Sequence, residues 1–594
     1  MPFDSILHHL FRQASLRPTA PAYFEKREGR WQAASYRRYA DQVRQAARAL
    51  IALDFKPGQA AAILGFNRSE WVIADLGAMA AGGVPAGIYT TCSPEEVQYI
   101  IDHSGAPIVF VENLSQWSKV ERELHRLPNL RHVVLMRGAP KVDHPMVLSW
   151  EEFLAKAEGV DPKRVDERVE QLEPAGLATF IYTSGTTGPP KAVMLSHRGL
   201  VWTAETAVKT MKVTHEDYGL SYLPLSHVAE QMLSIHVVIA AGCSVYFAES
   251  LDRLADNLKE VQPTVFFGVP RVWEKFFTGI RGKLAEAKGA KKKIADAARA
   301  VGRQRSAYLN RGEQPPPHLR AAHELFNRLV YSKLKEAIGL KNARVCVSGA
   351  APIAREVLEF FSEFDLRILE VYGQSEDNGP TSINLPGKTR FGTVGPAFPG
   401  VEVKIADDGE IIVRGPNVFL GYYKDEAATN ETLIDGWLHS GDLGEFSPDG
   451  FLSITGRKKE ILITSGGKNI APRNIEEGIK GCPLVGEAVV IGDRRKYLTA
   501  LITLEPEACA KLMSEKGLSG PAHECKEIRD IIQARVDEVN SSLARVETVK
   551  KFTLLHKPFS LETGELTPTL KIRRKVVNQR YASEIEAMYG NEDA

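Results

Sequence analysis

The stretch LATFIYTSGTTGPPKAVMLSHRGL at residues 177–200 decides the fold, because it joins a strand-like run to a helical segment through an unusual loop. The loop is rich in hydroxyls and glycines and ends in a lysine. Glycine allows backbone N–H groups to turn toward an anion, hydroxyls donate to its oxygens, and a lysine supplies positive charge. This composition predicts a phosphate-binding loop formed by Thr183, Ser184, Gly185, Thr186, Thr187, Gly188 and Lys191.

The loop differs from the Walker A motif of many nucleotide-binding proteins. That motif places four residues between its first glycine and a Gly-Lys-Ser/Thr triplet. Here two residues separate Gly185 from Gly188, and Ala192 follows Lys191. A phosphate site of another type is therefore expected.

The sequence on the N-terminal side of the loop alternates between strand-like and helical segments. From residue 36 onward apolar residues step by four and three positions, which predicts one buried helix face. Strand-like segments lie at 60–66, 84–89 and 106–113, and helical segments at 69–83 and 93–105. Ser93, Pro94 and Glu96 form the start signal of the last helix. The alternation implies parallel strands with crossover helices.

The alternation of strand-like and helical segments continues to about residue 450, and the pattern then changes. Short strands separated by Asp-Gly turns follow, together with a helical segment at 527–543 and a basic end. We therefore predict a large N-terminal α/β domain at 1–457, with layered, largely parallel sheets and crossover helices. A smaller α+β C-terminal domain is predicted at 458–594.

Length and composition exclude several classes of protein. The 594 residues are too many for a single small module, and 44% hydrophobic with 25% charged residues is ordinary for a globular chain. With 75 basic against 74 acidic residues the net charge is +1, so no global field attracts nucleic acid. The six cysteines contain no C-x-x-C pair, and the first residues do not resemble an export signal. A soluble protein in a reducing cytosol is expected.

Further motifs accompany the phosphate loop, and together they resemble the adenylate-forming superfamily of acyl-CoA synthetases, firefly luciferases and peptide-synthetase adenylation domains. In family order they are LPLSH at 223–227, SGAAP at 348–352, VYGQSE at 371–376, GWLHSGD at 436–442, GRKKE at 456–460, SGGKN at 465–469 and TPTLK at 567–571. Ser375 stands where the superfamily usually has threonine, which keeps the hydroxyl. The forms YGQSEDNGP, LPLSHVAEQ and TPTLKIRRK are most similar to bubblegum-type and bacterial long-chain acyl-CoA synthetases.

The resemblance implies a role for each motif residue. The adenine and nucleotide contacts it implies are Gly349, Ala350, Tyr372, Gly373, Gln374 and Ser375, with Asp442 and Arg457 at the ribose. Glu376 is the implied Mg²⁺ ligand, His227 lies at the carboxylate pocket, and Lys571 bridges the carboxylate and the α-phosphate, with Thr183 beside them. The implied hinge is Lys459, about which the small domain rotates, and the implied coenzyme A side is the loop with Gly466 and Gly467. Taken singly, each polar residue here also has an ordinary structural explanation.

The resemblance implies a long-chain fatty acid–CoA ligase that uses ATP, Mg²⁺ and coenzyme A and passes through an acyl-adenylate. Two alternatives stay open. A fatty acyl-adenylate ligase would deliver the acyl group to the phosphopantetheine of a carrier protein. A non-catalytic fatty-acid-binding or uptake protein would have no need of Glu376 and Lys571. A third alternative, luciferase-type oxygenation, is less favoured than these two.

One basic segment at 281–311 is left outside these motifs. It carries ten lysines and arginines against Glu286 and Asp296 and ends before a proline run, which predicts a helical insertion at about 281–320. A solvated charged surface is the favoured interpretation, and a weak peripheral contact with the inner membrane face is the alternative. The expected partners are otherwise small molecules, without nucleic acid.

Overall fold

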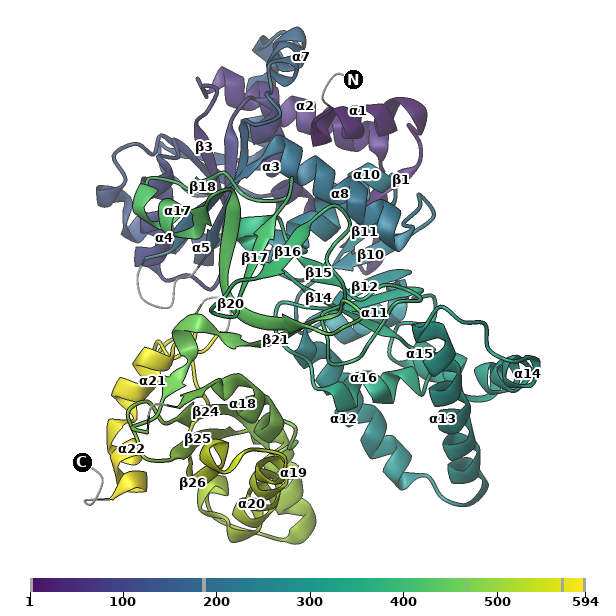
Figure 1. Ribbon diagram of the computed structural model, residues 1–594. Helices are drawn as coiled ribbons and strands as arrows, with labels where there is room; N and C mark the ends of the chain where they lie inside the picture. Colours follow the sequence, from purple (N-terminus) through teal and green to yellow (C-terminus); the bar gives the residue numbers. More distant parts are fainter. Residues whose placement is uncertain (1–3, 184–188, 467, 568–570, 591–594) are drawn as a thin grey trace.

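The strand that leads into the predicted phosphate loop lies in the central sheet of the large domain (Figure 1). In the computed structural model, which describes residues 4–183, 189–466, 468–567 and 571–590, this is an eight-stranded sheet with the order β18-β9-β8-β4-β3-β5-β6-β7. Its strands are β3 (Ala60–Leu64), β4 (Val84–Ile88), β5 (Ile108–Val111), β6 (His132–Leu135), β7 (Val147–Ser149), β8 (Leu177–Thr183), β9 (Lys191–Ser196) and β18 (Gly421–Tyr422). The first six of these are parallel, as predicted. β9 pairs antiparallel with β8, and β18 pairs antiparallel with β9.

The predicted crossover helices are present. They include α2 (Tyr36–Ala52), α3 (Ser69–Ala80), α4 (Pro94–Ser104) and α5 (Leu114–Arg122). In α4 the Oγ of Ser93 accepts from the Glu96 N–H at 3.2 Å, and the Glu96 carboxylate accepts from the Ser93 N–H at 2.9 Å. Gly105 then ends the helix with a φ of 68°. Local capping chemistry therefore determines both ends of α4.

Two further sheets complete the large domain. One has the order β10-β11-β1-β2 and contains β1 (Pro21–Arg27), β2 (Arg30–Ser35), β10 (Tyr218–Ser221) and β11 (Ser244–Phe247). The other has the order β12-β13-β14-β15 and contains β12 (Val265–Gly268), β13 (Val345–Ser348), β14 (Ile368–Tyr372) and β15 (Ser382–Ile383). Long helices such as α8 (His197–Met211) pack between the sheets, and α1 (Ile6–Leu16) packs on α2. Two predicted site motifs follow β13 and β14.

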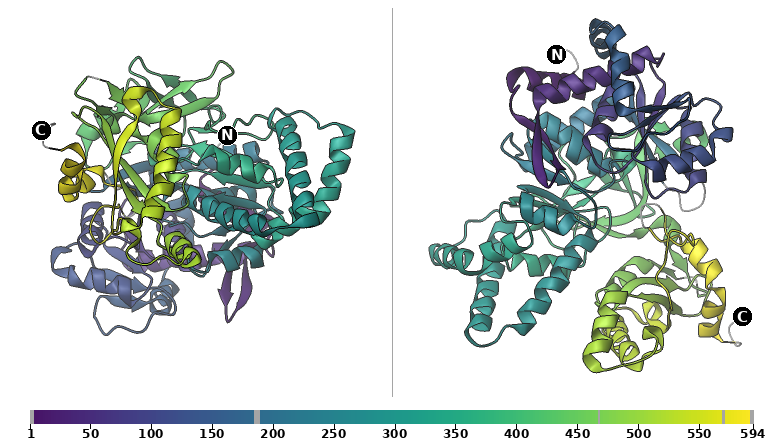
Figure 2. Two further views of the ribbon diagram at one scale, coloured as in Figure 1. Left: turned by 90° about the horizontal axis from the view of Figure 1, so that it is seen from below. Right: turned by 180° about the vertical axis from the view of Figure 1, so that it is seen from behind.

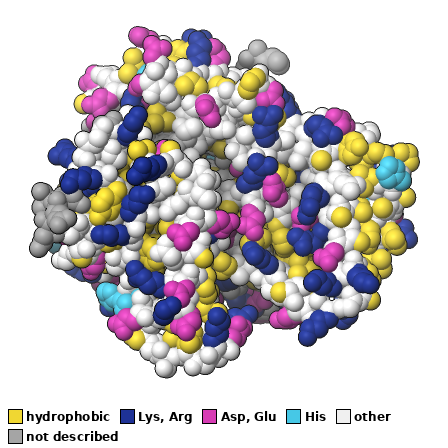
Figure 3. All heavy atoms as spheres, turned by 60° about the horizontal axis from the view of Figure 1, so that its bottom comes forward, with side chains coloured by type: hydrophobic (Ala, Val, Ile, Leu, Met, Phe, Trp, Pro, Cys, Tyr) yellow, Lys and Arg dark blue, Asp and Glu magenta, His cyan; other side chains and the backbone are white. Residues whose placement is uncertain are grey.

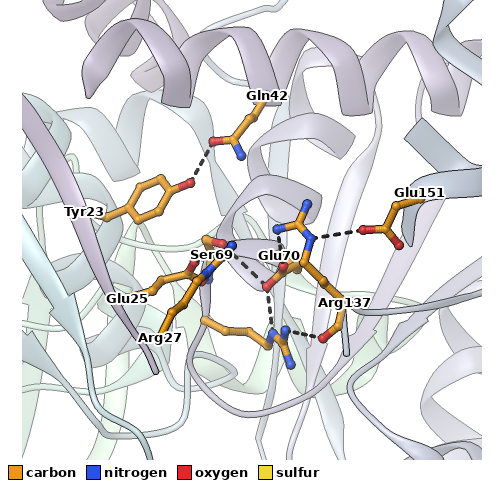
Figure 4. Close-up of polar contacts among 9 residues, drawn as sticks. Tyr23, Glu25, Arg27, Gln42, Ser69, Glu70, Arg137 and Glu151 are labelled. Carbon is orange, nitrogen blue, oxygen red and sulfur yellow. Dashed lines mark hydrogen bonds and ion pairs between the residues drawn. The ribbon is translucent and has the colours of Figure 1, made fainter. Parts of the chain in front are cut away.

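Ion pairs occupy the carboxyl ends of β3 and β6, where open α/β sheets often bind ligands (Figure 4). The side chain of Glu70, only 1% exposed, pairs with Arg68 at 2.8 Å and with Arg137 at 3.0 Å. The neighbouring Ser69 N–H donates to Glu25 of β1 at 2.9 Å. This network ties α3 to β1 and to the end of β6. It serves packing, and the predicted site residues lie elsewhere.

An antiparallel sheet connects the large domain to the smaller one. It has the order β16-β17-β20-β19, with β21 paired to β20, and contains β16 (Glu402–Ile405), β17 (Glu410–Arg414), β19 (Leu433–Ile434), β20 (Trp437–Phe446) and β21 (Leu452–Arg457). After β21 the chain enters a separate lobe, which Figures 1 and 2 show beside the large domain. The boundary at 457/458 stays a prediction.

The smaller lobe has its own apolar core, formed by residues from Ile470 onward. Its three-stranded sheet has the order β24-β25-β26, with β24 (Val485–Ile491), β25 (Leu498–Leu504) and β26 (Val549–Leu554). The helices are α18 (Pro472–Lys480), α19 (Pro506–Lys516), α20 (Lys526–Ser541), α21 (Arg574–Arg580) and α22 (Ala582–Tyr589). This is the α+β composition predicted from the sequence.

The basic segment forms part of a helical projection from the large domain, visible in both views of Figure 2. It contains α12 (Pro270–Glu286), α13 (Gly289–Asn310), α14 (Pro317–Phe326), a π-helical turn at Asn327–Tyr331 and α15 (Ser332–Ala337). In the described part of the chain no helix is long and apolar enough to cross a membrane.

Candidate active site

The phosphate loop connects two antiparallel strands. Thr183 at the end of β8 pairs in register with Lys191 at the start of β9, and α8 begins only after β9. The sequence expectation of a direct passage from strand to helix was therefore wrong, because residues 191–196 extend the sheet. Ser184, Gly185, Thr186, Thr187 and Gly188 lie outside the described residues.

Lys191 is held beside the loop by two residues that the sequence did not single out. Its Nζ lies 3.3 Å from Oδ2 of Asp425 and 4.8 Å from the ring centroid of Tyr422. Both partners come from the segment around β18, which pairs with β9. These contacts orient the Lys191 side chain toward the segment around β18.

The two predicted adenine-side turns lie at one edge of a sheet. Because β13 and β14 are parallel, the turns with Gly349 and Gly373 follow the same edge of the sheet, with Gly349 beside Val371. A Cβ on Gly349 would lie 2.6 Å from Cγ1 of Val371, and one on Gly373 would lie 1.4 Å from the carbonyl oxygen of Gly379. Ala350 has a φ of 68°, which is uncommon for a residue with a Cβ. Close backbone approach explains the glycines here.

The predicted adenine and ribose residues are joined directly. The Tyr372 hydroxyl donates to Oδ2 of Asp442 at 2.8 Å, and Arg457 Nε lies 3.0 Å from Oδ1. Asp442 and Arg457 are also cross-strand partners of β20 and β21. Burial and the Asp442 carboxylate raise the pKa of Tyr372 well above its usual value, so the phenol stays protonated. The ring of Tyr372 is thus fixed by its hydroxyl.

Glu376 lies on a short 3₁₀ turn at Ser375–Asp377, directly after β14 and Gln374. Its Oε1 accepts from the Tyr422 hydroxyl at 2.7 Å, so the residue that stacks on Lys191 also orients this carboxylate. The turn is anchored by the Gln374 N–H, which donates to Asp377 at 2.9 Å. No group of three or more metal-binding side chains occurs among the described residues.

His227 begins the short helix α9 (Val228–Gln231). Its Nδ1 accepts from the Ala229 N–H at 3.1 Å, which leaves the ring proton on Nε2. Burial, together with the positive charge of Lys571, lowers the pKa of His227 to about 4. The imidazole is therefore neutral at physiological pH and offers a donor.

Lys571 of the small domain lies close to the predicted site residues of the large domain. Its N–H donates to Thr567 Oγ1 at 3.0 Å, and the Thr567 N–H donates to its carbonyl at 2.8 Å, closing a tight turn. Lys571 is an exposed residue, although surrounding protein removes part of the water from its charged group. This partial burial lowers the pKa of Lys571, Arg457 lowers it further, and Asp442 and Glu376 oppose the shift. The structure therefore gathers predicted residues from both domains.

Ion pairs also join the two domains. Arg573 of the small domain is 3.7 Å from Glu96 at the start of α4. Arg271 at the start of α12 is 3.4 Å from Glu505 in the small domain. Within the described chain, no hydrogen bond or ion pair joins Lys459 or Gly466 to the other predicted residues. Both are exposed, and Gly467 lies outside the described residues.

Comparison with known proteins identifies the class. The chain belongs to the AMP-binding enzyme family: the model of that family matches residues 10–423, and the model of the AMP-binding enzyme C-terminal domain matches residues 459–593.

Several named relatives are more specific. The chain is 38% identical to the long-chain-fatty-acid–CoA ligase ACSBG2 of Gallus gallus, over 98% of this chain and 81% of the relative. It is 37% identical to the long-chain-fatty-acid–CoA ligase FadD15 of Mycobacterium bovis, over 99% and 98%. The fold matches the crystal structure of the anthranilate CoA ligase AuaEII in complex with anthranoyl-AMP, with a TM-score of 0.71 at 20% identity, covering 98% and 99% of the two chains.

Proposed function

We propose that the protein ligates a long-chain fatty acid to coenzyme A at the expense of ATP, through an acyl-adenylate. The observation that carries this proposal is the position of Lys571, a small-domain ammonium that shares one site with Arg457, Asp442 and Glu376 of the large domain. The names of the near-full-length relatives give the substrate class.

In the first half-reaction a carboxylate oxygen of the fatty acid attacks the α-phosphorus of ATP, and pyrophosphate leaves with the bonding electron pair. Both reactants are anions, so the chain must supply positive charge and alignment. Lys191 lies at the β- and γ-phosphate side, and Lys571 lies at the carboxylate and α-phosphate. The ribose hydroxyls donate to Asp442, whose carboxylate oxygens retain acceptor capacity beyond Tyr372 and Arg457.

Glu376 is the residue in this arrangement that would hold Mg²⁺. The fit rests on its donor set. Tyr422 orients the Glu376 carboxylate and also contacts Lys191, and Mg²⁺ usually takes one or two carboxylates and substrate phosphates. When bound, the ion would neutralise charge on the phosphate oxygens. Tyr422 fixes the rotamer of Glu376 and thereby the position of that charge.

His227 acts as a donor in this proposal. Because its pKa is about 4, it cannot serve as a cationic partner at neutral pH, and its Nε2–H is free to bind a carboxylate or acyl oxygen. It would orient the fatty carboxylate without transferring a proton.

In the second half-reaction the thiol sulfur of coenzyme A attacks the acyl carbon, the thiol loses its proton, and AMP leaves. We propose that the small domain turns at Lys459 for this step and presents the loop with Gly466 and Gly467. Lys459 follows β21 in an exposed 3₁₀ turn, where a change of backbone angles disturbs little packing.

The test is a panel of acids from acetate to very long chains, scored for pyrophosphate release and for thioester formation with coenzyme A. Adenylation and thioester formation that both peak at long chains support the proposal. Thioester formation on a phosphopantetheinyl carrier protein in preference to coenzyme A would show the carrier-dependent alternative. No acid-dependent pyrophosphate release would show a binding protein.

A further inference from the structure

The helical projection of α12 to α15 takes no part in the proposed reaction, and its basic residues fall into two groups. The first group faces the large domain. Arg299 donates to Glu363 at 2.6 Å, Arg303 donates to the same carboxylate at 2.9 Å, and Arg305 pairs with Asp365. These arginines are paired with carboxylates of the large domain, which distinguishes them from the other basic residues of the segment.

The second group stands free at the tip of the projection. It consists of exposed lysines around the turn between α12 and α13, namely Lys283, Lys288, Lys291, Lys292 and Lys293. Within the part of the chain that the structure describes, none of them has an ion pair. The neighbouring acids are Glu286 and Asp296, so the tip carries a net positive charge.

Exposed apolar side chains accompany these lysines on the same projection. Ile294 follows the lysine run and is 42% exposed, while Leu325 of α14 and Leu329 of the π-helical turn are 55% and 46% exposed. Leu325 and Leu329 are four residues apart, which places them on neighbouring turns of one helical face. Figure 3 shows hydrophobic side chains gathered at this outer edge, with lysines and arginines beside them.

The base of the projection is rigidly attached. The Tyr331 hydroxyl donates to the Ala298 carbonyl at 2.6 Å, and Lys335 pairs with Asp365 at 3.0 Å. The exposed apolar residues and the lysines therefore lie on helices that are bonded to one another and, through Lys335, to Asp365.

We propose that this projection docks on an anionic phospholipid bilayer, with the tip lysines at the lipid headgroups and the exposed leucines at the interface. Charge complementarity identifies the partner: lysines give a diffuse attraction to a negative surface, and a few leucines bury too little area for a stable protein complex. The proposal rests on the proposed function in one respect, since long-chain fatty acids partition into bilayers and are met there. Docking at the headgroup level requires no membrane-spanning helix.

The binding should be weak and sensitive to salt. Each basic residue close to an anionic leaflet strengthens binding roughly fivefold, and salt screens the effect. Changing Lys291, Lys292 and Lys293 together to glutamate should therefore lower the vesicle partition coefficient by at least roughly 100-fold.

The experiment is cosedimentation of the full chain with vesicles of phosphatidylglycerol and phosphatidylcholine in equal parts, and with vesicles of phosphatidylcholine alone. The test variant is K291E/K292E/K293E. The matched control is K516E/K550E/K557E, which makes the same change of charge at exposed small-domain lysines. A second test variant, L325S/L329S, removes the apolar contact without changing the charge. Circular dichroism checks that each variant is folded.

Salt-reversible binding to anionic vesicles, lost in the first variant, weakened in the second and kept in the control, is the expected result. Binding that is absent at low salt, equal on neutral vesicles, or equally reduced by the control would overturn the proposal. Pyrophosphate release with water-soluble octanoate, without vesicles, tests the proposed function separately and should be unchanged in both test variants.

Discussion

Replacing Lys571 by alanine should stop the first half-reaction and spare the second. In the structure Lys571 shares the site with two further cations, Arg457 and Arg473, and with two carboxylates, Asp442 and Glu376. Removal of the lysine takes one positive charge away from the place where an anionic carboxylate must approach an anionic phosphate.

The size of the effect follows from that loss. One cation at a contact distance of about 4 Å in a site of intermediate dielectric contributes about 4 kcal/mol. Removing a preorganised donor to a developing charge typically costs roughly 100- to 1,000-fold in kcat. We therefore expect adenylate formation by Lys571→Ala to fall by roughly 1,000-fold.

The assay separates the half-reactions: acid-dependent pyrophosphate release for the first, and thioester formation from a supplied acyl-adenylate for the second. Lys575→Ala is the matched control, since Lys575 is an exposed lysine a few residues away on α21. An equal loss in both half-reactions, or an equal loss in the control, would refute the assignment.

The same lysine predicts a pH dependence. Its pKa is lowered by partial burial and by Arg457, and the reaction needs the protonated form. Adenylate formation should therefore be present below this pKa and decline as the pH rises through it, earlier than for an ordinary lysine. Lys571→Arg should move this alkaline decline to higher pH, because guanidinium stays protonated.

Three smaller perturbations test the rest of the site. Tyr422→Phe removes the hydrogen bond to Glu376 and should lower kcat for adenylate formation by about tenfold, since a bond to a charged group contributes roughly 1.5–3 kcal/mol, with little change in thermal unfolding. Gly373→Ala places a methyl group 1.4 Å from a backbone carbonyl oxygen and should destabilise the fold by at least about 1–3 kcal/mol in urea unfolding, whereas Gly282→Ala, which meets nothing within 4 Å, should not. Arg573→Ala breaks a partly exposed interdomain ion pair and should slow adenylate formation about two- to fivefold while leaving thioester formation from supplied adenylate unchanged.

The parts of the fold that depend on local chemistry could be predicted from the sequence. The ends of α4 follow from Ser93, Pro94, Glu96 and Gly105, and the parallel sheet follows from alternating apolar segments. The strand β9 was missed because it is short and continuous with a loop whose composition dominates that stretch. Its pairing with β18, more than 200 residues away, is a tertiary effect.

In the candidate site, too, the residues within sequence motifs were predictable, and those that depend on tertiary packing were not. The motifs named Asp442, Arg457, Glu376 and Lys571, and the structure brings these four together. The sequence did not indicate Tyr422 or Asp425, because the segment GYYKDE does not have the composition of a phosphate loop. Its role arises from the pairing of β18 with β9. The hydrogen bond from the Tyr372 hydroxyl could not be predicted either. An aromatic hydroxyl next to a carboxylate is visible only once the chain is folded. The roles of Lys459, Gly466 and Gly467 stay predictions.

The central claim is that a fatty carboxylate attacks the α-phosphorus of ATP, and the fate of the carboxylate oxygen tests it most directly. Oleate labelled with heavy oxygen in its carboxyl group is incubated with the protein, ATP and coenzyme A, and the products are analysed by mass spectrometry. The account predicts one labelled oxygen in AMP for each thioester formed, and none in pyrophosphate. Label in a phosphate released from the γ-position, or thioester formed with unlabelled AMP, would contradict it.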